Sequence, residues 1–485
     1  MKYAIDLFVD GKRLAGDGDT EFTSVNPATG EAIGQFREAS ASQIELAIDS
    51  ATAAQKEWAA FPAEERGRIL RKAADLLRAR NDELSRIEVD DTGKPIAEAA
   101  TVDVQTGADA IEHYANLAGS LQGEYQDFGY GFYYTRREPL GVCAGIGAWN
   151  YPLQIACWKS APALACGNAM IFKPSELTPI SAVHLAEVYC EAGVPPGVFN
   201  VLQGERGPGA ALSEHPGIAK VSLTGSAPTG RKVMAAASPR LKHVSLELGG
   251  KSPFIIFDDA DPEHAARLAM YANFLTQGEI CANGTRVFIH ASIYDAVVEK
   301  ILERTAKLRV GPPSDPSTQI GALISENHLN VVSGFVERAW SAGARVLAGG
   351  HRVEVAGCEN GFFYAPTVIG DSTDDMEHVR EEIFGPVMTL LKFDTEDEVV
   401  ERANDSDYGL AGGVVTKDLA RAHRIAASIQ TGMFWINTYQ AQPMQIPFGG
   451  YKQSGIGREN GWDVLDQYTQ KKSVFVQMKD EELPF

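Results

Sequence analysis

The chain contains 485 residues, of which 44% are hydrophobic, 22% charged and 9% aromatic. This composition excludes disordered and fibrous proteins, and the length predicts two or three domains. The 64 acidic and 44 basic side chains give a formal net charge of −20, which disfavours nucleic acids and anionic membranes as partners. The start lacks a signal-peptide pattern, and no apolar run reaches the ~18 residues of a membrane span, so we expect a cytoplasmic protein.

The first half of the chain predicts helices followed by a parallel sheet. Residues 40–90 carry apolar side chains at three- and four-residue spacing, including Ile44, Ile48, Leu70 and Leu77, which is typical of amphipathic packing helices. From residue 139 the apolar runs LGVCAGIG, NAMIFK, GVFNVL, IAKVSL, HVSLEL and SPFIIF alternate with helical stretches or Gly/Pro turns. This alternation predicts a doubly wound α/β sheet. The stretches GERGPGA and GPPSDPS are expected to be loops.

The second half predicts another α/β domain. The same alternation resumes after about residue 285 with TRVFIHAS and continues to GMFWIN. Just before the first sheet, Phe128, Tyr130, Phe132 and Tyr134 recur at period two, and the C-terminal KKSVFVQM is also strand-like. Neither segment has an obvious sheet of its own, so we expect an arm that pairs with another subunit.

One of the six cysteines is a candidate nucleophile. The six lack CxxC or Cys/His metal spacing and are interpreted as free thiols. Cys281 lies in NFLTQGEICANGTRVF, a stretch bracketed by glycines and followed by a strand, where a loop could present the thiol. Most single cysteines are inert packing residues. A catalytic role for Cys281 therefore requires a base and an oxyanion donor nearby.

Two polar residues at the ends of predicted strands could supply these partners. Glu247 closes HVSLEL, and ligands bind at the carboxyl ends of strands in open α/β sheets, so its carboxylate is a candidate base. Asn150 in GAWNYP follows LGVCAGIG, and its amide could donate to an oxyanion. The alternatives are a solvated acid at a strand end and an ordinary turn residue.

Two further strand ends could bind a nucleotide. Gly225 and Ser226 in LTGSAPTG would let a phosphate approach the N–H groups at the start of a helix. Lys173 and Glu176 in FKPSE could bind ribose hydroxyls. The pattern is not GxGxxG, and a lone Gly-Ser pair is a weak signal by itself.

Taken together, these motifs resemble the aldehyde dehydrogenase superfamily over essentially the whole chain, most closely its betaine-aldehyde and trimethylaminobutyraldehyde dehydrogenases. The motifs in the family's order are GAWNYPLQ, IFKPSE, LTGS, LELGGKS, GEICANGTR, EEIFGPV and PFGGYKQSGIGREN. The resemblance implies an α/β fold with a Rossmann-type NAD-binding domain formed by 1–124 and 142–249 and a catalytic α/β domain formed by 250–432. A small β oligomerisation arm and C-terminal segment would comprise 125–141 and 433–485.

The resemblance also implies catalytic roles. Cys281 matches the family's nucleophile and Glu247 its general base, while Asn150 matches the side chain that stabilises the oxyanion together with the backbone N–H of Cys281. Lys159 and Glu459 match a proton-relay pair. In this chemistry, thiolate attack makes a hemithioacetal that gives up hydride to NAD, and the base then activates water against the resulting thioester.

The cofactor implied by the resemblance is NAD. Glu176 would accept a hydrogen bond from a ribose 2′-hydroxyl and repel a 2′-phosphate, which favours NAD over NADP. Relatives also hold a structural monovalent cation, whose ligands no motif identifies here. The matched cofactor contacts are Ala148, Trp149, Lys173, Pro174, Ser175, Glu176, Gly204, Gly225, Ser226, Thr229, Gly249, Glu382 and Phe384.

Aromatic residues indicate the substrate. Tyr151 and Trp158 are seven residues apart and would share a helix face, and Phe448 is assigned to the same pocket by resemblance. Such rings hold a quaternary ammonium by cation–π attraction, although they also suit a generic hydrophobic tunnel. Leu275, where some betaine-aldehyde enzymes carry an aromatic residue, weakens a strict betaine assignment.

The leading hypothesis is therefore an NAD-dependent dehydrogenase for quaternary-ammonium aldehydes that acts as a homo-oligomer, either a dimer or a tetramer. The alternative within this chemistry is an ω-aminoaldehyde or general aliphatic aldehyde dehydrogenase. A different class is a cofactor-independent thiol esterase that uses Cys281 and Glu247, and a non-catalytic protein on this fold is a third alternative. The combined presence of Lys173, Glu176 and Glu382 disfavours the esterase.

The chain departs from the family pattern at one position near the nucleophile. Most relatives have Gln two residues before it, whereas this chain has Glu279. A nearby carboxylate would raise the pKa of the Cys281 thiol and slow thiolate formation. Either Glu279 turns away from the thiol or the enzyme prefers alkaline pH.

Overall fold

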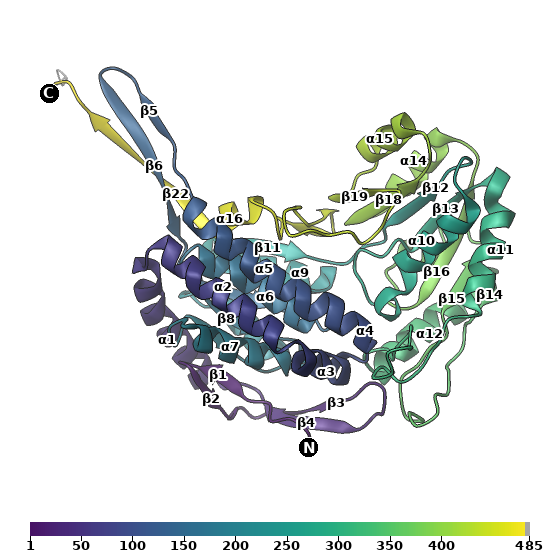
Figure 1. Cartoon of the computed structure of the whole chain (residues 1–485), viewed down its shortest axis with the longest axis horizontal. Coiled ribbons are helices and arrows are strands. Elements are labelled where there is room, and N and C mark those ends of the chain that lie inside the picture. The colour runs from purple at the N-terminus through teal and green to yellow at the C-terminus, as the bar shows by residue number, and fades with distance from the viewer. Residues whose placement is uncertain (481–485) are drawn as a thin grey trace.

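The five apolar runs from LGVCAGIG to HVSLEL form an eight-stranded sheet with two N-terminal strands and one late strand in the computed structural model, which describes residues 1–480 (Figure 1). The run SPFIIF, which was expected to continue this sheet, forms a strand of the second sheet instead. The strand order is β2-β1-β9-β8-β7-β10-β11-β21, and the five strands from β9 to β11 are parallel. Antiparallel strands border this parallel core on both sides. The strands are β1 (Leu7–Val9), β2 (Lys12–Leu14), β7 (Val142–Ile146), β8 (Ala169–Lys173), β9 (Phe199–Val201), β10 (Lys220–Thr224), β11 (His243–Glu247) and β21 (Gly455–Ile456).

Helices cover both faces of this sheet because its strands are apolar on both sides. One face packs against α6 and α7, with α2 and α5 behind them, and the other packs against α1, α8 and α9. The helices are α1 (Ala41–Ala60), α2 (Ala63–Ala79), α3 (Asn81–Thr92), α4 (Ile96–Glu98), α5 (Val104–Leu117), α6 (Pro152–Ala165), α7 (Ser181–Ala192), α8 (Arg206–Glu214) and α9 (Ala227–Ala237). A π-helical turn, Ala99–Asp103, joins α4 to α5.

The later apolar runs form a second, seven-stranded sheet in the order β14-β15-β16-β13-β12-β18-β19. All neighbouring pairs are parallel except β14 with β15. The strands are β12 (Pro253–Ile256), β13 (Arg286–His290), β14 (Arg345–Ala348), β15 (Thr367–Gly370), β16 (Val387–Phe393), β18 (Ala411–Val415) and β19 (Met433–Ile436). The predicted fold class, two α/β units built on separate sheets, is confirmed.

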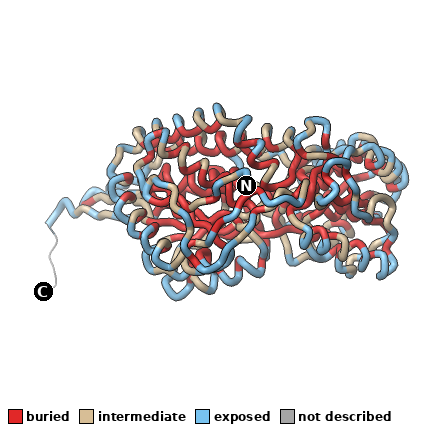
Figure 2. Tube along the Cα trace, turned by 90° about the horizontal axis from the view of Figure 1, so that it is seen from below, coloured by how far each residue is buried: buried red, intermediate tan, exposed pale blue. Residues whose placement is uncertain are grey.

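Helices again cover both faces of the second sheet. Helices α10 and α11 pack on one face, and α12, α13, α14 and α15 pack on the other. Figure 2 shows buried residues throughout the interior of both units, with exposed residues at the periphery. The helices are α10 (Pro262–Phe274), α11 (Tyr294–Thr305), α12 (Glu326–Ser341), α13 (Glu377–Arg380), α14 (Glu396–Asn404) and α15 (Leu419–Ser428).

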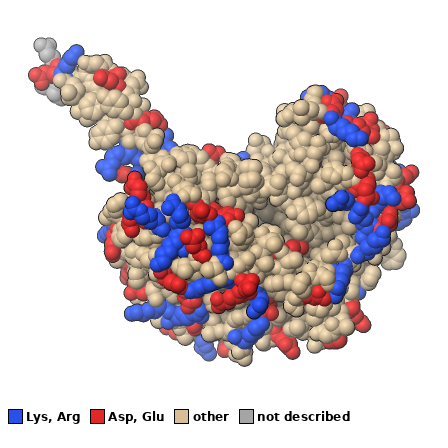
Figure 3. Space-filling view, viewed as in Figure 1, with Lys and Arg blue, Asp and Glu red and all other residues tan. Residues whose placement is uncertain are grey.

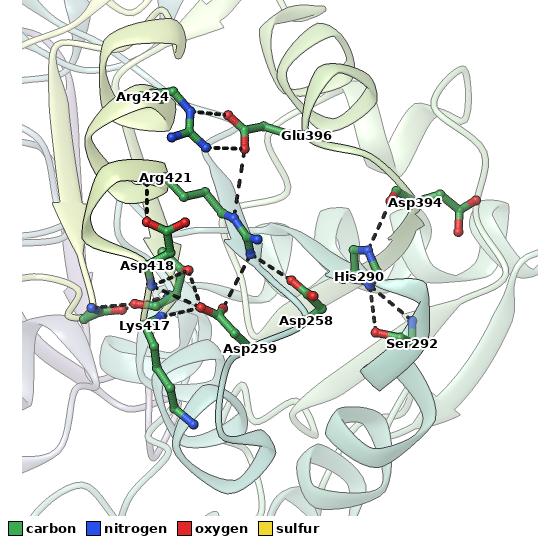
Figure 4. Close-up of polar contacts among 12 residues, drawn as sticks. Asp258, Asp259, His290, Ser292, Asp394, Glu396, Lys417, Asp418, Arg421 and Arg424 are labelled. Atoms are coloured by element: carbon green, nitrogen blue, oxygen red, sulfur yellow. Dashed lines mark hydrogen bonds and ion pairs between the residues drawn. The ribbon is translucent and has the colours of Figure 1, made fainter.

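The carboxyl edge of the second sheet is closed by ion pairs (Figure 4). Asp258 and Asp259 follow β12, and the Arg421 guanidinium on α15 lies 2.7 Å from a carboxylate oxygen of Asp258 and 3.6 Å from one of Asp259. The Nε and Nη2 atoms of Arg424 each donate a 3.0 Å hydrogen bond to one carboxylate oxygen of Glu396. The other oxygen of Asp259 accepts three hydrogen bonds from the loop after β18. Most of the polar groups at this edge therefore already have protein partners.

A three-stranded arm projects from the first unit (Figure 1). Strand β6 (Gly131–Pro139) pairs with β5 (Tyr125–Asp127) on one side and, over nine residues, with β22 (Thr469–Gln477) on the other. The two strand-like segments without an obvious sheet thus pair with each other. The remaining short strands are β3 (Glu21–Val25), β4 (Ala32–Arg37), β17 (Tyr408–Gly409) and β20 (Tyr451–Lys452), and the last helix is α16 (Asp463–Gln467).

The stretch GERGPGA was expected to be a loop, and this prediction is wrong from Arg206 onward. Helix α8 begins at Arg206, because Pro208 falls in its first turn, where a missing N–H costs nothing. The second stretch, GPPSDPS, is a loop. Within the described part of the chain, no helix has the length and apolar character needed to cross a membrane.

Candidate active site

A cavity of about 620 Å³ lies where the carboxyl edge of the first sheet meets the second unit. The loops after β7, β8, β10 and β11 contribute residues to it, as do Cys281 and Glu382 from the second unit. Figure 3 shows that the surface is hollowed between the two units and that the side chains around this hollow are mostly uncharged. The cavity matches the position expected for a ligand in an open α/β sheet.

Cys281 lies on the loop between α10 and β13. The loop begins with a short turn in which Thr276 and Gln277 have positive φ values of 49° and 42°, a conformation that non-glycine residues rarely adopt. Burial raises the pKa of the Cys281 thiol, and the carboxylates of Glu382 and Glu247 raise it further, while the backbone N–H groups of Cys281 and Ala282 lower it. The resting thiol is therefore protonated at neutral pH and needs a base.

Glu247 is the last residue of β11. Its strand is clamped from both sides, because Glu247 pairs with Thr224 of β10 and with Gly455 of β21. The side chain is buried, and neither carboxylate oxygen has a hydrogen-bond partner among the described residues. Burial raises the pKa of Glu247 well above its ordinary value. A raised pKa makes this carboxylate a stronger base toward a nearby thiol than an exposed one.

Asn150 lies in the loop between β7 and α6, on the wall of the same cavity. Its side-chain amide donates to the backbone carbonyl of Glu279 at 3.0 Å, which ties this loop to the segment just before Cys281. The backbone carbonyl of Asn150 accepts a 2.7 Å hydrogen bond from the Nζ of Lys94. Lys94 is a buried residue that the sequence analysis did not single out. The structure thus brings Asn150, Glu247 and Cys281 together around one space.

Lys159 and Glu459 do not line the cavity but form an ion pair directly behind Glu247. Both are buried, and the Lys159 ammonium also donates to the Ser222 hydroxyl at 3.0 Å. Glu459 raises the pKa of Glu247, and Lys159 lowers it, so both charges act on the candidate base. This position suits a pair that exchanges protons with Glu247.

One end of the cavity has the features of a nucleotide site. Gly225, Ser226 and Thr229 surround the N-terminus of α9, and the Ser226 hydroxyl contacts the Thr229 hydroxyl at 3.1 Å but accepts no hydrogen bond from the helix backbone. The N–H groups of this first turn are therefore available to an anion. Lys173 and Glu176 lie nearby with 3.4 Å between Nζ and a carboxylate oxygen, and burial lowers the pKa of Lys173.

Glu382, Phe384 and Trp149 line the part of the same cavity that also contains Cys281. Glu382 accepts a 3.0 Å hydrogen bond from the Gly250 N–H, and burial raises the pKa of Glu382 to about 7. A Cβ at Gly249 would lie 2.1 Å from a Glu382 oxygen, so only glycine permits this approach. The Phe384 ring lies edge-on to the Trp149 ring at 5.1 Å. A planar group could be held between these residues and Cys281.

The comparisons with known proteins agree with this geometry. The model of the aldehyde dehydrogenase family matches residues 14–474. The chain belongs to the aldehyde dehydrogenase family. A solved aldehyde dehydrogenase from Bacillus cereus in complex with NAD+ is 40% identical, with a TM-score of 0.95 over 98% of this chain and 97% of that one.

Two other solved structures resemble the chain as closely in fold. The NAD-dependent aldehyde dehydrogenase from Sinorhizobium meliloti is 38% identical, with a TM-score of 0.97 over 100% of this chain and 97% of that one. An indole-3-acetaldehyde dehydrogenase in complex with NAD+ is 36% identical, with a TM-score of 0.95 over 98% of this chain and 96% of that one. Both similarities extend over nearly the whole of each chain.

Within this aldehyde dehydrogenase fold, most of the predicted cofactor contacts line the cavity. The exceptions are Pro174, which lies between two lining residues, and Gly204, whose neighbour Glu205 lines it. Gly204 has a φ of 145°, and an added Cβ would lie 2.7 Å from Pro208, so this glycine serves the turn into α8. The residues that line the cavity without having been predicted include Glu205, Arg206, Lys232 and His328. Glu205 and Arg206 lie at the N-terminus of α8, so predicting this helix from sequence would have indicated both.

The predicted substrate residues do not line this cavity but belong to the hydrophobic cluster against which Cys281 packs. Trp158 and Phe448 are buried, with ring centroids 6.1 Å apart, and Tyr151 and Leu275 pack partly buried against the same cluster as Cys281. All four predicted residues therefore lie in one hydrophobic cluster with Cys281. The sequence prediction of a shared aromatic region is consistent with this arrangement.

One face of Tyr151 is already occupied by a cation. The Lys94 ammonium lies 3.8 Å from the centroid of the Tyr151 ring. The Tyr151 hydroxyl lies 2.7 Å from the Thr276 hydroxyl, so the ring is held at both ends. The face of Tyr151 that Lys94 covers is therefore closed to a substrate.

Glu279, the departure from the family pattern, turns away from the thiol. Its two carboxylate oxygens accept hydrogen bonds from the Ile324 N–H at 3.0 Å and from the Gln277 amide at 2.9 Å. The carboxylates that raise the pKa of Cys281 belong to other residues, as described above. Of the two alternatives stated from sequence, the first therefore describes the structure.

Proposed function

We propose that the chain is an NAD-dependent dehydrogenase that oxidises quaternary-ammonium aldehydes, such as betaine aldehyde or trimethylaminobutyraldehyde, to carboxylic acids. The observation that carries the proposal is one cavity that holds a free thiol, an unpaired buried carboxylate and an amide donor, namely Cys281, Glu247 and Asn150. These are the parts that acyl chemistry on a thiol requires.

The residues at the nucleotide end fit NAD. The first turn of α9 offers unpaired N–H groups to a pyrophosphate, Glu176 offers a carboxylate to a ribose hydroxyl, and Glu382 with Phe384 lies at the end near the thiol. The NAD+ complex of the Bacillus cereus relative supports this assignment. When bound, NAD supplies the acceptor for the hydride that leaves the substrate.

The chain's own residues provide the rest of the mechanism. Glu247 accepts the proton of the Cys281 thiol, whose raised pKa makes this assistance necessary. The thiolate attacks the aldehyde carbon, and the Asn150 amide with the Cys281 N–H stabilises the negative charge that develops on oxygen. After hydride loss leaves a thioester, Glu247 activates water to release the acid.

The proton that Glu247 gains must leave the interior. The buried pair of Lys159 and Glu459 lies behind it and contacts the Ser222 hydroxyl. We propose that this pair relays the proton, since its charges already act on Glu247. The relay also keeps Glu247 ready for the next cycle.

The aromatic cluster beside the thiol supports a quaternary-ammonium substrate. Trp158 and Phe448, with the free face of Tyr151, would surround a trimethylated cation that has no N–H to donate. The runner-up is an ω-aminoaldehyde or aliphatic aldehyde, and the 36% identical relative named for indole-3-acetaldehyde, a neutral aldehyde, favours keeping it in the test.

We also propose a cytosolic homo-oligomer, a dimer or a tetramer. The arm exposes Tyr125, Phe128, Tyr130 and Phe475 to solvent, and contiguous aromatic groups of this kind mark protein contacts. The six free thiols suit a reducing compartment.

A panel of aldehydes tests the proposed function. NADH formation and acid formation are measured with trimethylated, primary-amine and neutral aldehydes of equal chain length, for the parent protein and Cys281→Ala. Acid formation is also measured without NAD. We expect the highest kcat/KM for the trimethylated aldehyde, no acid without NAD, and no product from Cys281→Ala. Cys190→Ala, which removes another partly exposed thiol, is the matched control and keeps full activity. Equal kcat/KM values for the three aldehydes would remove the case for a cation site.

A further inference from the structure

Lys94 is a fully buried lysine whose ammonium group touches two consecutive residues of the site. Its Nζ pairs with Asp103, which is equally buried, and donates to the Asn150 carbonyl at 2.7 Å. It also lies 3.8 Å from the centroid of the Tyr151 ring. An ammonium has three N–H donors, and a carboxylate, a carbonyl and an aromatic face account for all three. A buried charge needs such partners.

The backbone around Asn150 needs this contact because regular structure does not hold it. The loop between β7 and α6 has neither strand nor helix geometry at Asn150. Among the hydrogen bonds of the described residues, Lys94 provides the donor to the Asn150 carbonyl. The orientation of the peptide unit between Asn150 and Tyr151 therefore depends on a side chain from another part of the fold.

A π-helical turn places the partners of Lys94. The turn Ala99–Asp103 joins α4 to α5, and π-helical turns are rare and often lie at functional sites. It puts the Asp103 carboxylate against Lys94 at one end. At the other end Glu98 accepts hydrogen bonds from the N–H and the hydroxyl of Thr276, at 2.8 and 2.7 Å.

The same short segment thus holds both sides of the reaction centre. Lys94 holds the Asn150 loop, and Glu98 holds the left-handed turn at Thr276 that precedes Cys281. The hydrogen bond between the Tyr151 and Thr276 hydroxyls joins the two sides. A bridge of this kind fixes the distance between an oxyanion donor and a nucleophile, on which rates depend steeply.

We propose that Lys94 is a positioning residue for the oxidation: held by Asp103, it fixes the peptide unit after Asn150 and so aims the Asn150 amide at the developing oxyanion. The inference rests on the proposed function, because it needs Asn150 in that role. Lys94 itself does not touch the reacting atoms. Its effect should therefore appear in kcat and pass through Asn150.

The first experiment compares Lys94→Met with Arg66→Met in the full-length protein. Arg66 is a matched control, since it is a buried cation that donates to the carbonyls of Ala165 and Phe61, away from the cavity. We expect both variants to lower Tm, but only Lys94→Met to lower kcat, by about 10- to 100-fold, with little change in the Kd for NAD. An equal loss of kcat in both variants would show a merely structural role and overturn the proposal.

The second experiment is a double-mutant cycle with Asn150→Ala. If Lys94 acts through Asn150, Lys94→Met changes kcat by less than about twofold once the Asn150 amide is gone. Independent losses that multiply in the double variant would contradict the proposal. Should Lys94→Met not fold, Lys94→Met with Asp103→Asn removes both buried charges and takes its place in the cycle.

The outcomes separate this inference from the proposed function. If Asn150→Ala keeps the parent kcat, the positioning role of Lys94 is overturned together with the oxyanion role of Asn150, while the Cys281 chemistry stands. If Cys281→Ala still forms NADH, the proposed function fails whatever the cycle shows. Additive losses with an inactive Cys281→Ala overturn the inference alone.

Discussion

The carboxyl edges of the two sheets differ in how their charged groups are used. At the first sheet, Glu247 has no hydrogen-bond partner among the described residues and faces a cavity. At the second sheet, Asp258 and Asp259 both form ion pairs with Arg421 (Figure 4). Parallel strands deliver polar residues to both edges. We propose that the first edge serves as the reaction site because the fold leaves the Glu247 carboxylate there without an ion-pair partner.

The two edges also differ in what they contribute to stability. An unpaired buried carboxylate costs free energy, and the raised pKa of Glu247 reflects that cost. The ion pairs around Arg421 are partly exposed and contribute modestly. We therefore expect substitutions at the first edge to change the rate and substitutions at the second edge to change stability.

The largest effect is expected from Glu247→Gln. The amide cannot accept the thiol proton or activate water, so kcat should fall by about 10²- to 10⁴-fold, measured as NADH formation at saturating substrate. The thermal stability of the variant should equal or exceed that of the parent, because a costly buried acid is gone. Asp91→Asn, another buried acid that lies outside the cavity, is the control and should keep its activity. A fully active Glu247→Gln would remove Glu247 from the mechanism.

A smaller effect is expected from Arg421→Met at the closed edge. Loss of the guanidinium leaves Asp258 and Asp259 without their cation, which should lower the free energy of unfolding by about 1 kcal/mol. Arg424→Met removes a more exposed partner of Glu396 and should cost less. Denaturant unfolding measures both losses, and kcat should not change. A drop in kcat with unchanged stability would contradict the distinction between the edges.

The smallest effect on rate is expected from Glu279→Gln. The carboxylate faces Ile324 and Gln277, so the dependence of kcat on pH should not change. Burial raises the pKa of Glu279 to about 8 from its ordinary value of 4.5. Between these values the native state binds more protons than the unfolded state, so this group makes stability fall as pH rises.

The Tm of Glu279→Gln minus the Tm of the parent should therefore increase as the pH rises from about 5 to about 9. Thermal unfolding across this range measures the gain, and kcat–pH profiles of both proteins provide the companion measurement. A shifted kcat–pH profile would mean that the carboxylate reaches Cys281 during turnover, against the geometry of the resting structure.

Sequence patterns predicted the two sheets and the residues at their carboxyl ends because both depend on local information. A buried parallel strand corresponds to a short apolar run in the sequence; Glu247 ends one such strand, and Asn150 lies in the loop after another. The pairing of β6 with β22 could not be predicted in this way, because Gly131 and Gln477 are distant in sequence and the match depends on where the chain returns.

Lys94 and α8 were missed for different physical reasons. Lysine is almost always exposed, so a buried Lys94 is apparent only once Asp103, Asn150 and Tyr151 are seen around it. Helix α8 begins in a Gly/Pro-rich stretch that favours a loop locally, and tertiary packing of Leu212 decides otherwise. In both cases the signal lies in contacts between distant segments.

The clamping of β11 by β21 has a consequence for synthesis of the protein. Gly455 lies beside Glu247 in the sheet, and Glu459 pairs with Lys159 just behind it. The ribosome must therefore synthesise the chain at least as far as Glu459 before Glu247 gains its full surroundings. Before Glu459 is synthesised, the surroundings of Glu247 are incomplete, and we expect a chain that terminates before Glu459 to be inactive.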